Sequence, residues 1–163
     1  MITIRPVQQK EIPAVKLVIL TVAYNIFGFD GTFEDSIRHF EEVGEFEDMN
    51  NVKAYYENSG GRFLVVLDRE QVIGSGAIRR MDRETGELKR VWMLEKYHGQ
   101  GIGYRLIQQL FMFAREMGYI RIRIQTSPAQ KRALDFYRKL GFYEIPCYND
   151  ERNEISMEIK LSA

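Results

Sequence analysis

Three glycines stand at alternate positions in the segment YHGQGIGYRL, residues 97–106, directly before a helical pattern. They are Gly99, Gly101 and Gly103. Glycine lets a backbone turn sharply and approach a ligand closely. The first N–H groups of a helix have no partner inside the helix, and the helix dipole adds roughly half a positive charge there. The spacing therefore predicts a phosphate or other anion site at the start of this helix.

Two well-known phosphate loops do not fit these glycines. A Walker loop needs a second glycine five residues after the first, and Tyr104 stands five residues after Gly99. A dinucleotide fingerprint needs a glycine three residues after Gly101, where Tyr104 stands again. It also needs an acid at the end of the next strand, where Gln125 and Thr126 occur instead. A glycine-rich turn that binds nothing remains an alternative.

The elements around the loop alternate in a way that predicts one α+β domain over residues 1–163, with a mixed, mainly antiparallel central sheet flanked by helices. Period-2 and apolar runs predict strands at residues 2–6, 62–68, 71–80, 87–94, 119–126, 142–148 and 154–161. Helical patterns cover residues 8–27, pieces of 32–61, 102–117 and 127–141. In the first helix, an apolar stripe predicts the buried face: Ile12, Val15, Ile19, Val22, Ala23 and Ile26.

Composition limits the partners of this domain. Hydrophobic residues make up 45% of 163 residues, enough for a folded core, and 23 basic residues balance 23 acidic ones. A balanced charge argues against nucleic-acid binding, which needs a basic surface. The longest uncharged run, residues 17–29, is shorter than the ~20 residues of a membrane span, and no secretory signal opens the chain. We therefore expect a cytoplasmic protein without nucleic-acid or membrane partners.

Metal and thiol chemistry have little support in the sequence. His39 and His98 are far apart, and neither belongs to a pair with ligand spacing, so we expect no metal. Cys147 is the single cysteine, which excludes an internal disulfide. No histidine lies near it in the sequence, and we expect a buried structural thiol.

Residues 86–119, GELKRVWMLEKYHGQGIGYRLIQQLFMFAREMGY, and residues 133–142, ALDFYRKLGF, carry a resemblance to a known family. The first segment resembles the strand, acyl-CoA loop and helix of the GNAT superfamily of N-acetyltransferases, and the second resembles the other signature of that family. The resemblance extends over most of the chain. It implies an acyl-CoA N-acyltransferase fold with acetyl-CoA as co-substrate and a primary amine of a small molecule or a protein as acceptor.

The resemblance also implies which residues bind acetyl-CoA. The pantetheine arm would pair with the strand before the loop, with Met93 most central. The backbone of the loop would hold the pyrophosphate, although His98 stands where the family usually has Gln or Arg. Gln130 replaces an Asn that is frequent in the family. The implied binding residues are Val91, Met93, Leu94, His98, Gly99, Gln100, Gly101, Ile102, Gly103, Tyr104, Gln130 and Ala133.

Two side chains are the candidates for catalysis by the same resemblance. Glu87 lies eleven residues before His98, at the spacing of the catalytic glutamate in histone acetyltransferases, and would accept a proton from the amine. The alternatives are a solvated glutamate beside a turn, and a water chain as the base. Tyr137 would donate a proton to the leaving thiolate; the alternative is a tyrosine of the core.

The acceptor is less constrained. Seven acids between Glu34 and Asp48 would attract a cationic acceptor such as a polyamine, or they form a solvated helix face. Arg79 and Arg80 could instead hold a carboxylate. A non-catalytic acyl-CoA-binding regulatory module is the alternative to an enzyme, and a homodimer remains open.

Overall fold

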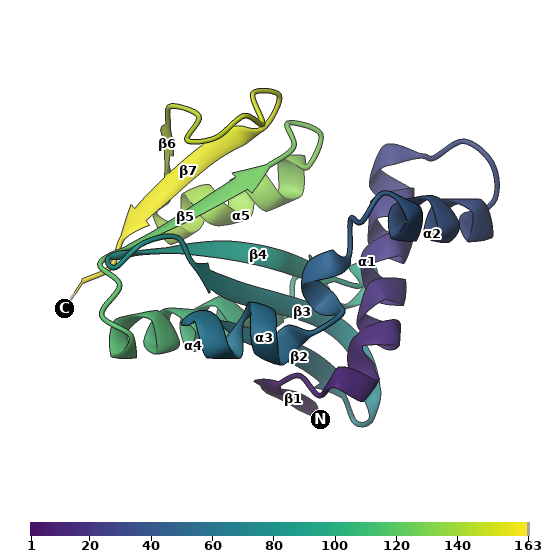
Figure 1. Ribbon diagram of the computed structural model, residues 1–163, viewed down its shortest axis with the longest axis horizontal. Helices are drawn as coiled ribbons and strands as arrows, with labels where there is room; N and C mark the ends of the chain where they lie inside the picture. Colours follow the sequence, from purple (N-terminus) through teal and green to yellow (C-terminus); the bar gives the residue numbers. More distant parts are fainter. Residues whose placement is uncertain (163) are drawn as a thin grey trace.

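The computed structural model describes residues 1–162. Its centre is a seven-stranded sheet in the order β1-β2-β3-β4-β5-β7-β6 (Figure 1). Only β4 and β5 run parallel, so the predicted mixed, mainly antiparallel sheet is confirmed. The strands are β1 (Ile2–Pro6), β2 (Arg62–Asp68), β3 (Gln71–Arg80), β4 (Thr85–Met93), β5 (Arg121–Thr126), β6 (Tyr143–Ile145) and β7 (Ile155–Lys160).

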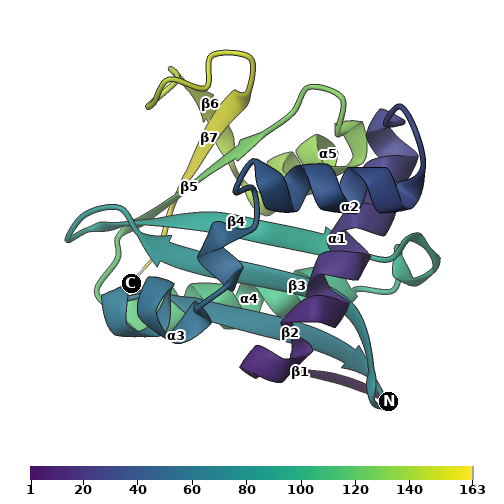
Figure 2. The same cartoon turned by 45° about the vertical axis from the view of Figure 1, so that its right-hand side comes forward.

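Helices cover both faces of this sheet. The α-helices are α1 (Ile12–Phe27), α2 (Phe33–Glu42), α3 (Val52–Tyr55), α4 (Ile102–Glu116) and α5 (Lys131–Leu140). In β2, Phe63, Val65 and Leu67 join the core under α1, while Leu64 and Val66 join the core under α4. Both faces of β2 are therefore buried, which explains its unbroken apolar sequence. Figure 2 shows α1 and α3 across one face and α4 behind the other.

Most predicted elements lie where the sequence places them, with local corrections. The first helix begins at Ile12, after a short 3₁₀ turn at Gln9–Glu11. Ile26 was predicted on its buried stripe but is 38% exposed, because the last turn of α1 extends beyond the sheet. The strand predicted at 142–148 ends at Ile145, and Pro146, which has no N–H to donate, follows it.

The feature that opens a cleft is the parting of β4 from β5. These strands pair only at Thr85↔Arg121, Gly86↔Ile122 and Glu87↔Arg123. Beyond Glu87 they diverge, and β5 and β7 rise away from β4 in Figure 1. The edge of β4 that faces β5 therefore carries peptide groups that no neighbouring strand pairs, over the second half of the strand.

A bulge in β4 adjoins this opening. Opposite β3, the register runs from Ala77↔Lys89 to Ser75↔Trp92, so β4 carries one extra residue there. Arg90 within the bulge has a φ of +57°, a left-handed conformation that costs a non-glycine residue about 1–2 kcal/mol. The hydroxyl of Ser75 donates to the Arg90 carbonyl at 2.7 Å. The strained residue thus has a fixed partner on β3.

The side chain of Arg90 is fixed by a buried carboxylate. Its guanidinium donates to Asp48 at 2.6 and 3.1 Å and to the Glu45 carbonyl at 2.5 Å. Asp48 is 6% exposed and also accepts from the Tyr56 hydroxyl at 2.5 Å. Burial opposes ionisation of Asp48, but the hydrogen bonds and charge of Arg90 outweigh it and hold the pKa of Asp48 below its usual value.

We predict that Asp48→Asn lowers the free energy of unfolding by about 3 kcal/mol at neutral pH, because it leaves the charge of Arg90 buried without a full partner. The native pKa of Asp48 is depressed, so its carboxylate stabilises the fold above the unfolded-state pKa. That contribution is lost as the pH falls through the native pKa. The difference between wild type and variant should therefore shrink in acid, as measured by urea denaturation.

The exposed neighbour Glu47 offers a control for this prediction. Glu47→Gln removes the same charge from the same segment and should change stability by less than about 0.5 kcal/mol. Equal stability of Asp48→Asn and wild type at neutral pH would contradict the proposed support of the bulge.

Candidate active site

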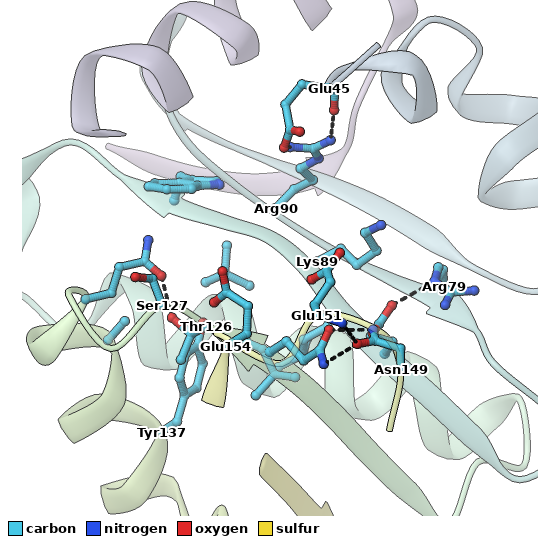
Figure 3. Close-up of a pocket in the computed structure, with 18 of the residues that line it drawn as sticks. Glu45, Arg79, Lys89, Arg90, Thr126, Ser127, Tyr137, Asn149, Glu151 and Glu154 are labelled. Carbon is cyan, nitrogen blue, oxygen red and sulfur yellow. Dashed lines mark hydrogen bonds and ion pairs between the residues drawn. The ribbon is translucent and has the colours of Figure 1, made fainter. Parts of the chain in front are cut away.

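A cleft of about 460 Å³ opens where β4 and β5 part (Figure 3). Its walls come from β4 between Glu87 and Trp92, the end of β5, the start of α5 and the loop before β7. Figure 3 shows Tyr137 rising from α5 on one side, with Glu45 and Arg90 on the opposite side. Five of the residues predicted from the sequence line this cleft: Glu87, Val91, Gln130, Ala133 and Tyr137.

The glycine loop enters α4 beside this region. Gly99 and Gly101 both have a φ of +78°, and a Cβ built on either would meet nothing within 4 Å. Glycine is therefore required here by backbone conformation, and the space beside it is open to a ligand. The first backbone bond of the helix runs from the Arg105 N–H to the Gly101 carbonyl. The N–H groups before Arg105 belong to the unpaired first turn, as an anion site requires.

Gly103 serves a different purpose from the two glycines before it. It lies inside α4, and a Cβ there would come within 3.5 Å of the Phe136 ring of α5. The small residue lets the first turn of α4 approach α5 closely. Tyr104, in contrast, is 55% exposed and directs its side chain to solvent.

The His98 ring is engaged by β4. Its Nε2 lies 3.0 Å from the carbonyl oxygen of Met93. Met93 is the last residue of β4 and pairs with Gly74 on β3, so the contact ties the loop to the end of the strand. Met93 and Leu94 lie beyond the part of β4 that lines the cleft. We expect His98 to support ligand binding indirectly, by holding the loop against Met93.

Gln130 stands at the N-terminus of α5 and is held by β5. Its side-chain oxygen accepts a hydrogen bond from the Thr126 hydroxyl. This bond fixes the amide of Gln130 beside the cleft wall. Ala133, one turn further on, leaves room between α5 and β4.

Tyr137 combines a buried ring with a hydroxyl at the cleft. The residue is 3% exposed, and its ring contacts Phe136 and Phe142 at centroid distances of 5.5 Å. Within residues 1–162, the Tyr137 hydroxyl makes no hydrogen bond. Every fully buried polar side-chain atom in the same range does have a partner, so this hydroxyl is not fully buried. The hydroxyl therefore reaches the open space of the cleft. Burial raises the pKa of Tyr137, which keeps this hydroxyl protonated at neutral pH.

Glu87 lies at the point where β4 and β5 separate, and it is 7% exposed. One carboxylate oxygen accepts from Arg79 Nε at 2.7 Å and the other accepts from the Tyr148 hydroxyl at 2.6 Å. Burial raises the pKa of Tyr148, and the hydrogen bond to Glu87 and its charge raise it further. Each carboxylate oxygen of Glu87 thus accepts one hydrogen bond, and the Tyr148 hydroxyl offers one route for a proton to this carboxylate.

The sequence reasoning missed these partners of Glu87. The pairing with Arg79 had a signal, because Arg79 and Glu87 are direct neighbours on adjacent strands. Tyr148, in the loop before β7, had none. The pairing also means that Arg79 is not free to hold a substrate carboxylate, and Arg80 donates to the Tyr119 hydroxyl instead.

Two further expectations change with the structure. Cys147 is exposed, not buried, because it lies in the loop after β6, with its thiol 3.0 Å from the Asn149 carbonyl. Three acids of the segment from Glu34 to Asp48 have partners within the protein: the Asp35 carboxylate accepts from the Thr32 N–H at the start of α2, Glu41 pairs with Lys16, and Asp48 pairs with Arg90. Glu45 is the member of that segment that lines the cleft.

Residues 24–142 match the acetyltransferase (GNAT) family, and the chain belongs to this family. Human N-acetyltransferase 8B is 32% identical over 101 residues, which are 58% of this chain and 44% of the human protein. The uncharacterized N-acetyltransferase YjgM of Escherichia coli is 28% identical over 116 residues, 69% of this chain and 70% of that protein. The chain thus spans less than half the length of the human relative.

Solved structures with the same fold cover nearly the whole chain. An acetyltransferase from Streptococcus agalactiae aligns with a TM-score of 0.83 at 24% identity and covers 98% of both chains. The PaiA N-acetyltransferase of Thermoplasma acidophilum, in complex with coenzyme A, aligns with a TM-score of 0.80 at 19% identity and covers 99% of both chains. None of the helices within residues 1–162 has the length and apolar character needed to cross a membrane.

We predict that Gly101→Val weakens binding of coenzyme A by roughly ten- to a hundredfold, since hydrogen bonds to charged groups contribute about 1.5–3 kcal/mol each. The valine side chain would fill the open space at the loop and disfavour its left-handed backbone. Isothermal titration calorimetry measures the affinity.

Gly118→Val is the matched control, because Gly118 has a φ of +83°, equally open surroundings and a position at the other end of α4. It should show a comparable loss of melting temperature and unchanged affinity for coenzyme A. Wild-type affinity of Gly101→Val for coenzyme A would show that the loop is not part of the binding site.

Proposed function

We propose that this protein is an acetyl-CoA-dependent N-acetyltransferase that acts on a primary amine. The observation that carries the proposal is the convergence on one cleft of the unpaired β4 edge and the free hydroxyl of Tyr137, beside the glycine loop. Family membership supports it, and so does the coenzyme A complex of the Thermoplasma acidophilum structure.

The residues present fit the co-substrate. The open space at Gly99 and Gly101 and the unpaired N–H groups of the first turn of α4 suit a pyrophosphate. The edge of β4 near Val91 offers peptide groups to the amides of a pantetheine arm, with Gln130 and Ala133 across the cleft. When bound, acetyl-CoA supplies the acetyl thioester that an amine can attack.

The ammonium of the acceptor loses two protons in all, one before the nitrogen attacks and one as the amide forms, and the departing thiolate takes up one; the second amine proton restores the group that protonates the thiolate. An alkyl amine with a pKa of about 10 is mostly protonated at neutral pH, so a base must accept a proton before the nitrogen can attack. We assign this role to Glu87, through Tyr148 or after release of one hydrogen bond. We assign the proton for the departing sulfur to Tyr137, whose unshared hydroxyl is available as a donor.

We predict that Tyr137→Phe lowers kcat by roughly ten- to a thousandfold, with little change in affinity for coenzyme A. The hydroxyl has no hydrogen-bond partner within residues 1–162, so its removal should change the free energy of unfolding by about 1 kcal/mol or less. Steady-state kinetics with acetyl-CoA and a thermal melt separate these two quantities.

The donor provides the control for Tyr137→Phe. An acetyl thioester of a nitrothiophenol has a leaving group that needs no proton, so the variant should regain most of its rate with it. Equal losses with both donors would rule out proton donation by Tyr137.

We predict that Glu87→Gln lowers turnover at neutral pH and removes the acidic limb of the pH–rate profile, because an amide cannot take up the proton. The comparison variant is Tyr148→Phe, which removes a hydrogen bond from Glu87 and leaves its carboxylate in place. Tyr148→Phe should retain the acidic limb, whether or not its rate falls. A wild-type profile in Glu87→Gln would leave a water chain as the base.

A further inference from the structure

A second cavity of about 260 Å³ adjoins the cleft on the side of α1 and α2. We call it the aromatic pocket, because its walls include Phe27, Phe29, Phe40, Phe46 and Trp92, with Glu45 also in the wall. Phe29 and Phe40 meet edge to face at 5.2 Å, and Phe40 and Phe46 lie 5.8 Å apart. The pocket and the cleft share Phe27, Glu45, Arg90 and Trp92, so the two spaces adjoin along a common wall.

The aromatic pocket lies on the opposite face of the sheet from Tyr137. Trp92 packs with the core under α1, whereas its neighbour Val91 and Tyr137 belong to the core under α4 and α5. A thioester beside β4 would therefore have its proton donor on one face and the aromatic pocket on the other. This arrangement suits an acceptor that enters from the α1 side while the thiol leaves on the α5 side.

The size of the pocket suits a ring. A protein cavity of ~150 Å³ lined by Leu, Ile and Phe stays dry and binds benzene. The aromatic pocket is larger, and several of its rings are partly open to solvent; Phe27 is 42% exposed. Burial of apolar surface contributes about 25 cal/mol per Å², so a phenyl or branched alkyl group would gain from filling it.

The charges around the two cavities disfavour a carboxylate on the acceptor. The lining of the cleft holds four acids (Glu45, Glu87, Glu151, Glu154) against three cations (Arg79, Lys89, Arg90). Two of these cations are already paired, Arg79 with Glu87 and Arg90 with Asp48. Glu45 is half-exposed at the shared wall, and its carboxylate lies 3.9 Å from the guanidinium of Arg90. On the far side of the cleft, burial and the charge of Glu151 raise the pKa of Glu154, as expected for neighbouring carboxylates.

We infer that the aromatic pocket holds the hydrocarbon group of the acceptor, and that the acceptor is an arylalkyl primary amine without a carboxylate. This inference rests on the proposed function. The ring occupies the pocket, the short alkyl link passes Trp92 and Glu45, and the amine reaches the thioester beside β4. Polyamines and amino acids are poorer acceptors, because the first lack a group for the pocket and the second carry a repelled carboxylate.

The test compares 2-phenylethylamine with n-propylamine, phenylalanine and spermidine as acceptors. Release of thiol from acetyl-CoA reports turnover, and calorimetry reports binding of each amine to the protein loaded with coenzyme A. We expect kcat/KM for 2-phenylethylamine to exceed that for n-propylamine by about tenfold or more, the range that hydrophobic pockets achieve. Spermidine or phenylalanine as the best acceptor would overturn the inference and leave the proposed function intact.

Ala23→Leu fills the pocket from α1, because Ala23 lines the pocket and not the cleft. It should lower kcat/KM and affinity for 2-phenylethylamine by about tenfold or more and leave n-propylamine within about threefold of wild type. Ala14→Leu makes the same change at an exposed position of α1 and should change neither. An equal loss for both amines in Ala23→Leu would overturn the inference.

Phe40→Ala enlarges the pocket and shifts the preference in the opposite direction, toward 2-(2-naphthyl)ethylamine. A gain for this bulkier amine relative to 2-phenylethylamine cannot arise from partial unfolding. If 2-phenylethylamine binds, if Ala23→Leu abolishes that binding and if no amine is acetylated, the pocket assignment stands and the proposed enzymatic function is wrong. If no amine binds and none is acetylated, the pocket assignment and the proposed function are both wrong.

Discussion

The parting of β4 from β5 after three residue pairs is the constraint on which the site depends. Two parallel strands that stayed paired would satisfy each other's peptide groups and leave no edge for a ligand. Their separation beyond Glu87 leaves part of β4 unpaired in the middle of a large sheet. The protein then surrounds that edge with α5, the end of β5 and the loop before β7.

Opening a sheet in its interior has a cost, and the chain offsets it on both sides of β4. On the β3 side, the bulge at Arg90 is fixed by Ser75 and by the ion pair with Asp48. On the β5 side, β7 and then β6 continue the sheet, so that β5 is not left as a free edge. The two faces of the sheet beside the cleft pack against different hydrophobic cores, one under α1 and the other under α4 and α5.

Much of this architecture could be predicted from the sequence. The alternating patterns predicted the strand and helix order, and the glycines at 99 and 101 predicted a loop at a helix N-terminus, because both signals are local. The left-handed Arg90 could not be predicted, since the carboxylate that holds its side chain lies 42 residues earlier in the chain. Tyr148 beside Glu87 is separated by 61 residues and has the same explanation. The prediction of a buried Cys147 was wrong, because the residue type alone does not determine which side chains of a loop face solvent.

The Asp48–Arg90 pair has a consequence for how such a protein can diversify. Asp48 belongs to the segment between α2 and α3, near the wall of the aromatic pocket, whereas Arg90 belongs to the strand that borders the cleft. The rings of Phe29 and Phe40 take no part in this ion pair, so a change at either position would leave both of its members in place. A change at Asp48 would also alter β4, so related proteins with a different pocket on the α1 side should retain this pair or replace both members together.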